Sequence, residues 1–331
     1  MFNIYGVITI IISFGITLIL IPYWMERTRQ HQLLGKDVHK LNVKLPEAGG
    51  ITVVLGSLIG ILFYIAITVF ILRETHWLAY MLAAISSILI ALIIGFADDV
   101  LGWRIGIKQR DKVLLSLLIP IPLMVVNSGQ SMMTIPLLGT VEFGLLYPLL
   151  IIPIGIIGAS NAFNMLAGYN GLEAGMGLIT MLALAILSVL NGAVWVAVIA
   201  FCIAASLFAF LLYNWYPSKI FPGDTLTYPV GASIAVIAIL ADIERYALSI
   251  FILYFIEFIL KARGGFVSDW TSDVSKSGVL SVRKKINTLP HLAIKVLRLI
   301  GIKTKEYNVV SLILFVQLFI ALLTIFSYVY L

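Results

Sequence analysis

Residues 77–101 read WLAYMLAAISSILIALIIGFADDVL, and this stretch indicates the kind of fold. Residues 77–97 carry no charged side chain, and about 20 apolar residues in a helix are enough to cross a bilayer. Asp98 and Asp99 follow directly. Carboxylates at the end of a membrane helix indicate cation binding or chemistry, and repulsion between neighbours can turn one of them into a usable base. A solvated helix end explains the pair equally well from these residues alone.

The composition of the whole chain agrees with a membrane protein. The 331 residues are 61% hydrophobic and 11% charged, whereas an ordinary soluble domain has about 25% charged residues. This excludes a soluble globular enzyme, a disordered chain and a disulfide scaffold. A single cysteine, Cys202, allows neither an internal disulfide nor a cysteine metal cluster.

Further apolar runs of similar length predict an all-α, polytopic membrane protein with about ten transmembrane helices, built as one integral membrane domain over residues 1–331. The runs are continuously apolar and do not alternate, which excludes a β-barrel. The predicted spans are 3–24, 49–72, 77–97, 113–127, 145–166, 172–190, 193–213, 226–241, 246–262 and 308–331.

Basic residues predict the orientation. All 22 lysines and arginines except Arg73 and Arg245 fall in the loops 25–48, 98–112, 214–225 and 261–307. Basic loops face the cytoplasm, so we expect both termini on the non-cytoplasmic side. The same basic face attracts anionic lipids and anionic substrates such as nucleotides.

The last basic segment and the span before it carry two further features. The segment 261–307 is predicted to be a cytoplasmic loop with an interfacial helix near Ile286–Leu299. Glu257 is an acidic residue inside the predicted span 246–262, and we expect it to pair with Lys261 four residues later.

Two polar motifs adjoin predicted spans. The first, NAFNMLAGYNGLEAG at 161–175, places Asn161 and Asn164 on one helix face, where amide oxygens can ligate magnesium. Its glycines allow a tight turn close to a ligand. The second, LLYNWYPSKIFPGDT at 211–225, ends in Asp224. The alternatives are helix–helix hydrogen bonding for the asparagines and a plain N-cap for Asp224.

Together with GFADDVL at 95–101, these motifs resemble the polyprenyl-phosphate N-acetylhexosamine-1-phosphate transferase family, most closely its eukaryotic and archaeal dolichyl-phosphate branch. The resemblance covers about residues 35 to 310. Bacterial members have an aspartate where this chain has Ala167, and their histidine-rich loop is represented here only by Pro290-His291.

The resemblance implies catalytic and metal-binding roles for matching residues. The implied catalytic residues are Asp98, Asp99 and Lys108. The two aspartates would lie near the phosphate acceptor, and the lysine would contact phosphate. The implied metal ligands are Asn164 and Asp224. From the residues alone, Asp98 as a base and Asp98 as a group that positions the acceptor both stay open, since a phosphate monoester is largely ionised at neutral pH.

It also implies contacts with the donor substrate. The nucleotide-binding residues are Glu47, Gly168, Asn170 and Phe221, with Phe221 stacked on uracil. The candidates for contact with sugar or phosphate are Asn161, Glu173, Arg263 and His291.

The implied reaction moves GlcNAc-1-phosphate from UDP-GlcNAc to dolichyl or another polyprenyl phosphate, releases UMP and begins lipid-linked oligosaccharide synthesis for N-glycosylation. Mg²⁺, or alternatively Mn²⁺, would neutralise pyrophosphate charge. We expect lipid and nucleotide-sugar partners, no nucleic acid, an archaeal cell membrane and a cytoplasmic active site; a homodimer stays open. The alternatives are another UDP-N-acetylhexosamine donor and a transporter of an anionic solute. The lack of paired broken helices argues against transport.

Overall fold

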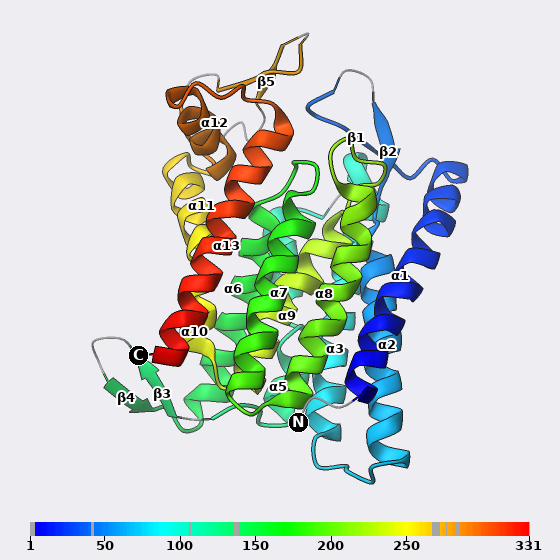
Figure 1. Cartoon of the computed structure of the whole chain (residues 1–331), viewed down its shortest axis with the longest axis vertical. Coiled ribbons are helices and arrows are strands. Elements are labelled where there is room, and N and C mark those ends of the chain that lie inside the picture. The colour runs from blue at the N-terminus through cyan, green and yellow to red at the C-terminus, as the bar shows by residue number, and fades with distance from the viewer. Residues whose placement is uncertain are drawn as a thin grey trace.

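A computed structural model describes residues 4–40, 43–105, 107–130, 132–135, 139–266, 272–275, 277–282 and 285–330. Within these ranges the chain is a bundle of long helices, with short hairpins at its two ends (Figure 1). The first half contains α1 (Ile4–Gln30), β1 (Leu34–Lys36), β2 (Lys44–Pro46), α2 (Gly50–Phe70), α3 (Leu78–Ile105), α4 (Gln109–Ser116), α5 (Ile121–Val125), β3 (Met132–Ile135), β4 (Gly139–Glu142), the π-helix η1 (Tyr147–Ile151) and α6 (Ile152–Met165). The second half contains α7 (Leu172–Leu190), α8 (Val194–Asn214), α9 (Asp224–Leu240), α10 (Glu244–Ile250), α11 (Ile252–Arg263), β5 (Asp273–Val274), β6 (Leu280–Ser281), α12 (Leu289–Leu299) and α13 (Glu306–Tyr330).

Seven helical segments in the described ranges are long and apolar enough to cross a membrane. They are Ile4–Gln30, Gly50–Phe70, Leu78–Leu101, Tyr147–Met165, Leu172–Leu190, Val194–Asn214 and Glu306–Tyr330. α9 is apolar but shorter. The predicted all-α, membrane-spanning class is therefore supported, while the predicted number of ten spans stays a prediction.

Two predicted spans are not single helices. The run 113–127 holds the end of α4 and the short α5, and the run 246–262 is divided between α10 and α11 at Phe251. In the first case Pro120 and Pro122 lie at the start of α5, a position where proline is tolerated. In the interior of one continuous helix they would interrupt the backbone hydrogen bonds, because proline has no backbone N–H group.

Helix α9 lies at the centre of the bundle. All its residues from Thr225 to Ile239 are buried, and it packs along α3 and α6, with α2, α7 and α8 also in contact. Gly95 of α3 makes the closest approach possible, because a Cβ there would lie 2.2 Å from the backbone oxygen of Asp224. Any side chain at this position would push the end of α3 away from the start of α9.

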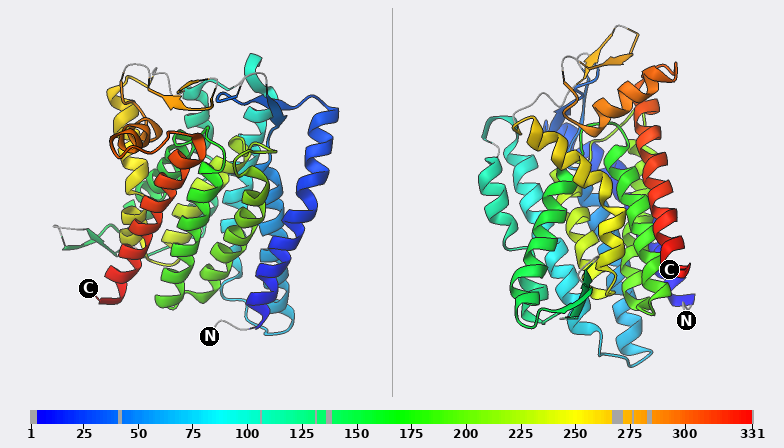
Figure 2. Two further views of the ribbon diagram at one scale, coloured as in Figure 1. Left: turned by 45° about the horizontal axis from the view of Figure 1, so that its top comes forward. Right: turned by 90° about the vertical axis from the view of Figure 1, so that its left-hand side faces the viewer.

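The start of α1 and the end of α13 lie at the same end of the bundle (Figure 1). The β1–β2 hairpin, α12 and the β5–β6 hairpin lie at the opposite end, as the turned views also show (Figure 2). In β1–β2 the register pairs Leu34 with Pro46 and Lys36 with Lys44.

The predicted helix near Ile286–Leu299 is present as α12. It buries one side, including Ala293, Ile294 and Leu297, and exposes Leu292 and Leu299. The order of apolar and basic residues therefore predicted this element correctly, while its place on a membrane surface stays a prediction.

Candidate active site

Three aspartates that are far apart in sequence meet where α3 ends and α9 begins. Asp98, Asp99 and Asp224 each contribute a carboxylate oxygen, and these atoms lie within 4.8 Å of one another. Such a cluster could hold a metal ion, because hard divalent cations prefer oxygen ligands. The arrangement results from the packing of α3 against α9, and the cluster belongs to the same end of the bundle as the β1–β2 hairpin.

A lysine that sequence reasoning missed lies between two of these acids. The Nζ atom of Lys112, in α4, is 2.6 Å from Asp98 Oδ2 and 2.7 Å from Asp224 Oδ2. Burial alone would lower the pKa of Lys112, but the carboxylates of Asp224 and Asp98 raise it above its ordinary value. Lys112 is therefore charged and offsets the repulsion between the two acids. Its place immediately before the apolar run 113–127 is the sequence signal that could have indicated it.

The two adjacent aspartates have different partners. Asp99 is buried and accepts hydrogen bonds from the backbone N–H groups of Asp224 (2.8 Å) and Thr225 (3.0 Å). Asp98 is partly exposed and, besides Lys112, accepts a bond from the backbone N–H of Ile107 (2.9 Å). Both oxygens of Asp99 are therefore engaged in holding the start of α9, whereas Asp98 faces the charged cluster.

The predicted pair of asparagines lies at the end of α6 and binds α9. Asn164 Oδ1 accepts a hydrogen bond from the Thr227 hydroxyl (2.9 Å), and Asn161 Oδ1 accepts one from Tyr228 (3.3 Å). Asn161 also donates to Ser116 at the end of α4 (3.2 Å). A carbonyl oxygen has two lone pairs, so Asn164 keeps an acceptor site for a cation.

The turn between α6 and α7 has the shape that the glycines predict. Gly168 and Gly171 have positive φ angles of 106° and 83°. The backbone N–H of Gly168 donates to Glu173 Oε1 (2.7 Å), and the N–H of Gly171 donates to Asn214 Oδ1 (3.1 Å). Glu173 is buried, and its Oε2 has no hydrogen-bond partner in the described part of the chain.

Asn170, in the same turn, is held from the far end of the sequence. The carboxylate of Glu306, the first residue of α13, accepts bonds from the Asn170 backbone N–H (2.8 Å) and side chain (3.4 Å). His39 lies beside this pair, with Nδ1 3.7 Å from Glu306 Oε1 and with its ring centroid 4.3 Å from that of Tyr169, the two rings being tilted by 39°. All four residues are buried. Sequence reasoning had no signal for this contact, because Glu306 lies outside every motif.

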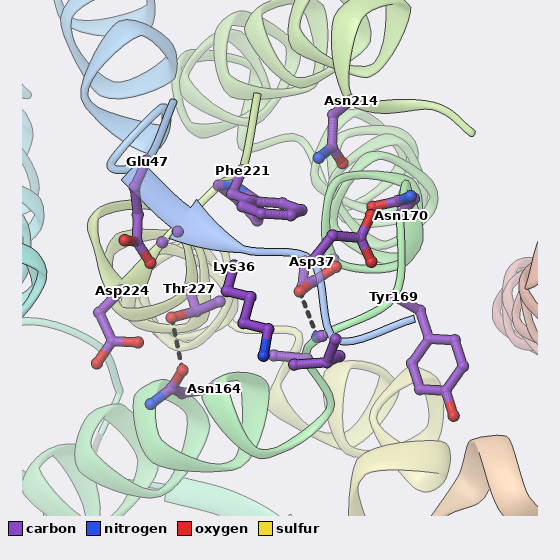
Figure 3. Close-up of a pocket in the computed structure, with 17 residues that line it drawn as sticks. Lys36, Asp37, Glu47, Asn164, Tyr169, Asn170, Asn214, Phe221, Asp224 and Thr227 are labelled. Atoms are coloured by element: carbon purple, nitrogen blue, oxygen red, sulfur yellow. Dashed lines mark hydrogen bonds between the residues drawn. The ribbon is translucent and has the colours of Figure 1, made fainter. Parts of the chain in front are cut away.

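These elements enclose a cavity of about 340 Å³ (Figure 3). It is lined by Gly35, Lys36, Asp37, Val38, Glu47, Asn164, Ala167, Gly168, Tyr169, Asn170, Glu173, Asn214, Phe221, Pro222, Gly223, Asp224 and Thr227. Asp224 and Asn164 lie at one side of the cavity, and Asn170 and Asn214 at the other, with the Phe221 ring between them (Figure 3). A flat aromatic side chain, amide groups and a carboxylate thus surround a single space.

Glu47 is the second acid at the Asp224 side of the cavity. Burial, followed by repulsion from Asp224 and Asp98, raises the pKa of Glu47 from 4.5 to about 6. The surroundings of Glu47 are therefore rich in negative charge, and a bound cation would reduce the repulsion between these carboxylates.

A second cavity, of about 540 Å³, lies between α6, α9, α10 and α11. Its lining is apolar apart from Asn161 and Glu244. Asn161 lines this groove and Asn164 lines the first cavity, so the two spaces border the same turn of α6.

Asp98 and Asp99 do not line either cavity themselves, and three further sequence candidates lie apart from both cavities in the described ranges. Lys108 is exposed at the N-cap of α4, and Arg263 is exposed and donates to the backbone oxygen of Ile286 (3.3 Å). His291 is buried in the first turn of α12. The predicted phosphate and sugar contacts of these three residues stay predictions.

The expected pair Glu257–Lys261 is present at 3.5 Å. Lys261 also donates to the backbone oxygen of Met165, at the end of α6, and Glu257 accepts from the backbone N–H of Leu289, at the start of α12, at 2.5 Å. The pair therefore ties α11 to both neighbouring segments of the site.

Comparisons with known proteins agree with this geometry. Residues 81–242 match the model of the family described as glycosyl transferase family 4. A protein of Sulfolobus acidocaldarius, named provisionally as a UDP-N-acetylglucosamine–dolichyl-phosphate N-acetylglucosaminephosphotransferase, is 33% identical over 96% of this chain and 94% of its own length. A protein of Dictyostelium discoideum that is named as a UDP-N-acetylglucosamine–dolichyl-phosphate N-acetylglucosaminephosphotransferase is 29% identical over 75% of this chain and 70% of its own length. A phospho-N-acetylmuramoyl-pentapeptide-transferase of Halalkalibacterium halodurans is 31% identical over 72% of this chain and 75% of its own length. With its acid cluster, its cavity and these relatives, the chain belongs to glycosyl transferase family 4.

Proposed function

We propose that this protein transfers N-acetylglucosamine 1-phosphate from UDP-GlcNAc to dolichyl phosphate, which yields the pyrophosphate-linked lipid and UMP. The observation that carries the proposal is that two different cavities border the same turn at the end of α6. One is lined by polar side chains that include Asp224 of the acid cluster, and the other is an apolar groove between membrane helices. A water-soluble nucleotide sugar and a lipid phosphate need such a pair of adjoining spaces.

The polar cavity suits the donor. Phe221 offers a ring on which a uracil base can stack, and the turn at Gly168 and Asn170 offers polar groups to the base edge. Asp224 and Asn164 at the other side are the proposed ligands of Mg²⁺, which would neutralise charge on the pyrophosphate. Asp98 completes the acidic surroundings.

The apolar groove suits the acceptor chain. Its walls include Phe251, Phe255 and Phe258, and its polar end is Asn161, close to the acid cluster. A polyprenyl chain in the groove would bring its phosphate to the end of α6.

The reaction forms one P–O bond and breaks another. An oxygen of the lipid phosphate attacks the sugar-bearing phosphorus, and the bond from that phosphorus to the bridging oxygen breaks, so that UMP leaves with the electron pair. Lys112, which pairs with Asp98 and Asp224, is our candidate for a positive charge that attracts the reacting phosphates toward the acid cluster. Asp98 then acts by holding Lys112, because a phosphate monoester is largely ionised at neutral pH and needs no strong base.

The topology forms part of the proposal. Ten spans, both termini outside and a cytoplasmic site would place the cavity where nucleotide sugars are made, in an archaeal cell membrane. The exposed apolar face of α12, with Leu292, Val296 and Leu299, would lie against the lipid at that surface.

The test uses purified protein with Mg²⁺, dolichyl phosphate and a panel of labelled UDP-GlcNAc, UDP-GalNAc and UDP-glucose, with mass spectrometry of the lipid product. We expect a GlcNAc-pyrophosphate lipid and UMP. Asp224→Asn should abolish turnover, whereas Asp242→Asn, just beyond the other end of α9, should leave it intact. Turnover that survives complete metal chelation, or that persists in Asp224→Asn, would refute the proposal, and a preference for UDP-GalNAc would correct the donor.

A further inference from the structure

The β1–β2 hairpin brings a lysine to the polar cavity, and no sequence motif indicated this lysine. The side chain of Lys36, the last residue of β1, extends into the cavity (Figure 3). Among the described residues that line this cavity, Lys36 is the one with a basic side chain. The cavity otherwise presents carboxylates, amides and apolar groups.

The hairpin is fixed in place against the site. Gly35 lies so close to its neighbours that a Cβ there would be 3.0 Å from both the Glu47 carboxyl carbon and the Phe221 ring. The backbone N–H of Phe221 donates to the oxygen of Pro46, the last residue of β2, at 2.8 Å. Lys36 therefore starts from a position set by two residues of the proposed nucleotide site.

Two other lysines near the cavity already have acidic partners, whereas Lys36 has none in the described part of the chain. Lys40 pairs with Asp37 at 2.9 Å, and Lys112 pairs with Asp98 and Asp224. Lys36 is exposed at the wall of the cavity, and an ammonium group there without an acidic partner is available to a bound anion.

The residue opposite Lys36 adds positive charge. The hairpin register pairs Lys36 with Lys44, and directly paired residues of an antiparallel ladder project from the same face. Like charges in such a pair are destabilising. Lys44 also lacks an acidic partner within the described ranges. A bound phosphate would turn this repulsion into attraction.

We propose that Lys36 is a phosphate-binding residue of the cavity and that its ammonium group contacts the pyrophosphate of the nucleotide-sugar donor, with Lys44 strengthening the local positive field. The inference rests on the proposed function. The donor is favoured over the lipid phosphate because Lys36 lines the polar cavity and not the apolar groove.

Calorimetry on the purified full-length protein with Mg²⁺ tests this inference, with UDP and uridine as the probes. Removing one charge-assisted contact should weaken UDP binding by about tenfold in Lys36→Gln. Uridine binding should not change, because uridine carries no phosphate, and Lys36→Arg should keep most of the affinity for UDP. Lys219→Gln is the matched control, since Lys219 is exposed on a neighbouring loop and does not line the cavity.

The possible results distinguish a failure of the Lys36 assignment from a failure of the proposed transferase function. Equal UDP affinity in Lys36→Gln and wild type would overturn the inference, as would an equal loss for UDP and uridine, which would indicate a structural effect. A raised KM for dolichyl phosphate with unchanged UDP affinity would assign Lys36 to the acceptor and overturn the donor contact. Failure of the wild-type protein to bind UDP would instead refute the proposed function.

Discussion

Replacing Asp99 by asparagine should separate the roles of the two adjacent aspartates. Both carboxylate oxygens of Asp99 accept backbone N–H groups at the start of α9, from Asp224 and Thr225. An asparagine side chain has one oxygen, so one of these N–H groups would face an NH₂ group that cannot accept it. The substitution also removes a negative charge from a helix N-terminus, where it is favourable.

The loss can be estimated from these contacts. A hydrogen bond to a charged group contributes about 1.5–3 kcal/mol, and a charge at a helix N-terminus contributes about 0.3–1 kcal/mol. We therefore expect Asp99→Asn to lower the free energy of unfolding by about 2–4 kcal/mol. For a chain of this size, that corresponds to a fall in Tm of roughly 4–8 °C.

Asp98→Asn is the matched comparison. This change keeps an oxygen for the Ile107 N–H and loses an attraction to Lys112, but it also removes repulsion between Asp98 and Glu47. We expect its Tm to stay within about 2 °C of wild type, in line with the small effect of opposing charge terms. Its turnover should nevertheless fall at least as far as that of Asp99→Asn.

The assay is thermal unfolding of the purified variants in one detergent, followed by tryptophan fluorescence, with turnover measured on the same samples. Equal Tm values for Asp99→Asn and wild type would refute the reasoning, because they would mean that the two backbone contacts do not hold α9. A large loss of Tm in Asp98→Asn would equally contradict the division of roles.

Three further substitutions test other parts of the site. Glu306→Ala removes both bonds to Asn170, so the Kd for UDP and the KM for the donor should rise about tenfold with little change in kcat, and Glu306→Gln should restore part of the affinity; an unchanged Kd would contradict this role. Burial and then repulsion from neighbouring acids raise the pKa of Glu47 to about 6, so the folded protein keeps a proton that the unfolded chain loses above about pH 4.5. Stability should therefore fall by about 2 kcal/mol as the pH rises from about 4.5 to about 6, and Glu47→Gln should remove this component from a pH series of unfolding curves; identical pH series would exclude it. Ala162→Phe fills part of the apolar groove, so the KM for dolichyl phosphate should rise while UDP binding measured by calorimetry stays the same; equal losses for both substrates would indicate misfolding instead.

The sequence predicted those parts of the site that local patterns determine. Asp98, Asp99 and Asp224 follow or precede apolar runs, and a charge beside such a run is conspicuous because the bilayer excludes charge elsewhere. The turn at Gly168 and Gly171 was predictable because glycine readily adopts positive φ. The helices of the bundle were predictable for the same local reason, from the length of each apolar run.

The parts that escaped prediction depend on contacts between distant segments. Lys112 is one of several basic residues in the 98–112 loop, and only the packing of α4 beside α3 and α6 selects it over Lys108. Glu306 could not be assigned because its partner, Asn170, is separated from it by most of the second half of the chain. Apolar periodicity carries no information about which polar side chains meet across the bundle.

The end of α6 determines how the two proposed substrates meet. Asn161 borders the groove, Asn164 borders the polar cavity, and both side chains bond to consecutive residues of α9, Tyr228 and Thr227. Three residues along a helix correspond to a rise of about 4.5 Å, so the walls of the two spaces lie within one helical turn of each other. Because α9 also carries Asp224 in its first turn, any shift of α6 along α9 would move the groove relative to the acid cluster. We therefore expect the packing of α6 on α9 to contribute to the geometry of the proposed transfer together with Asp224.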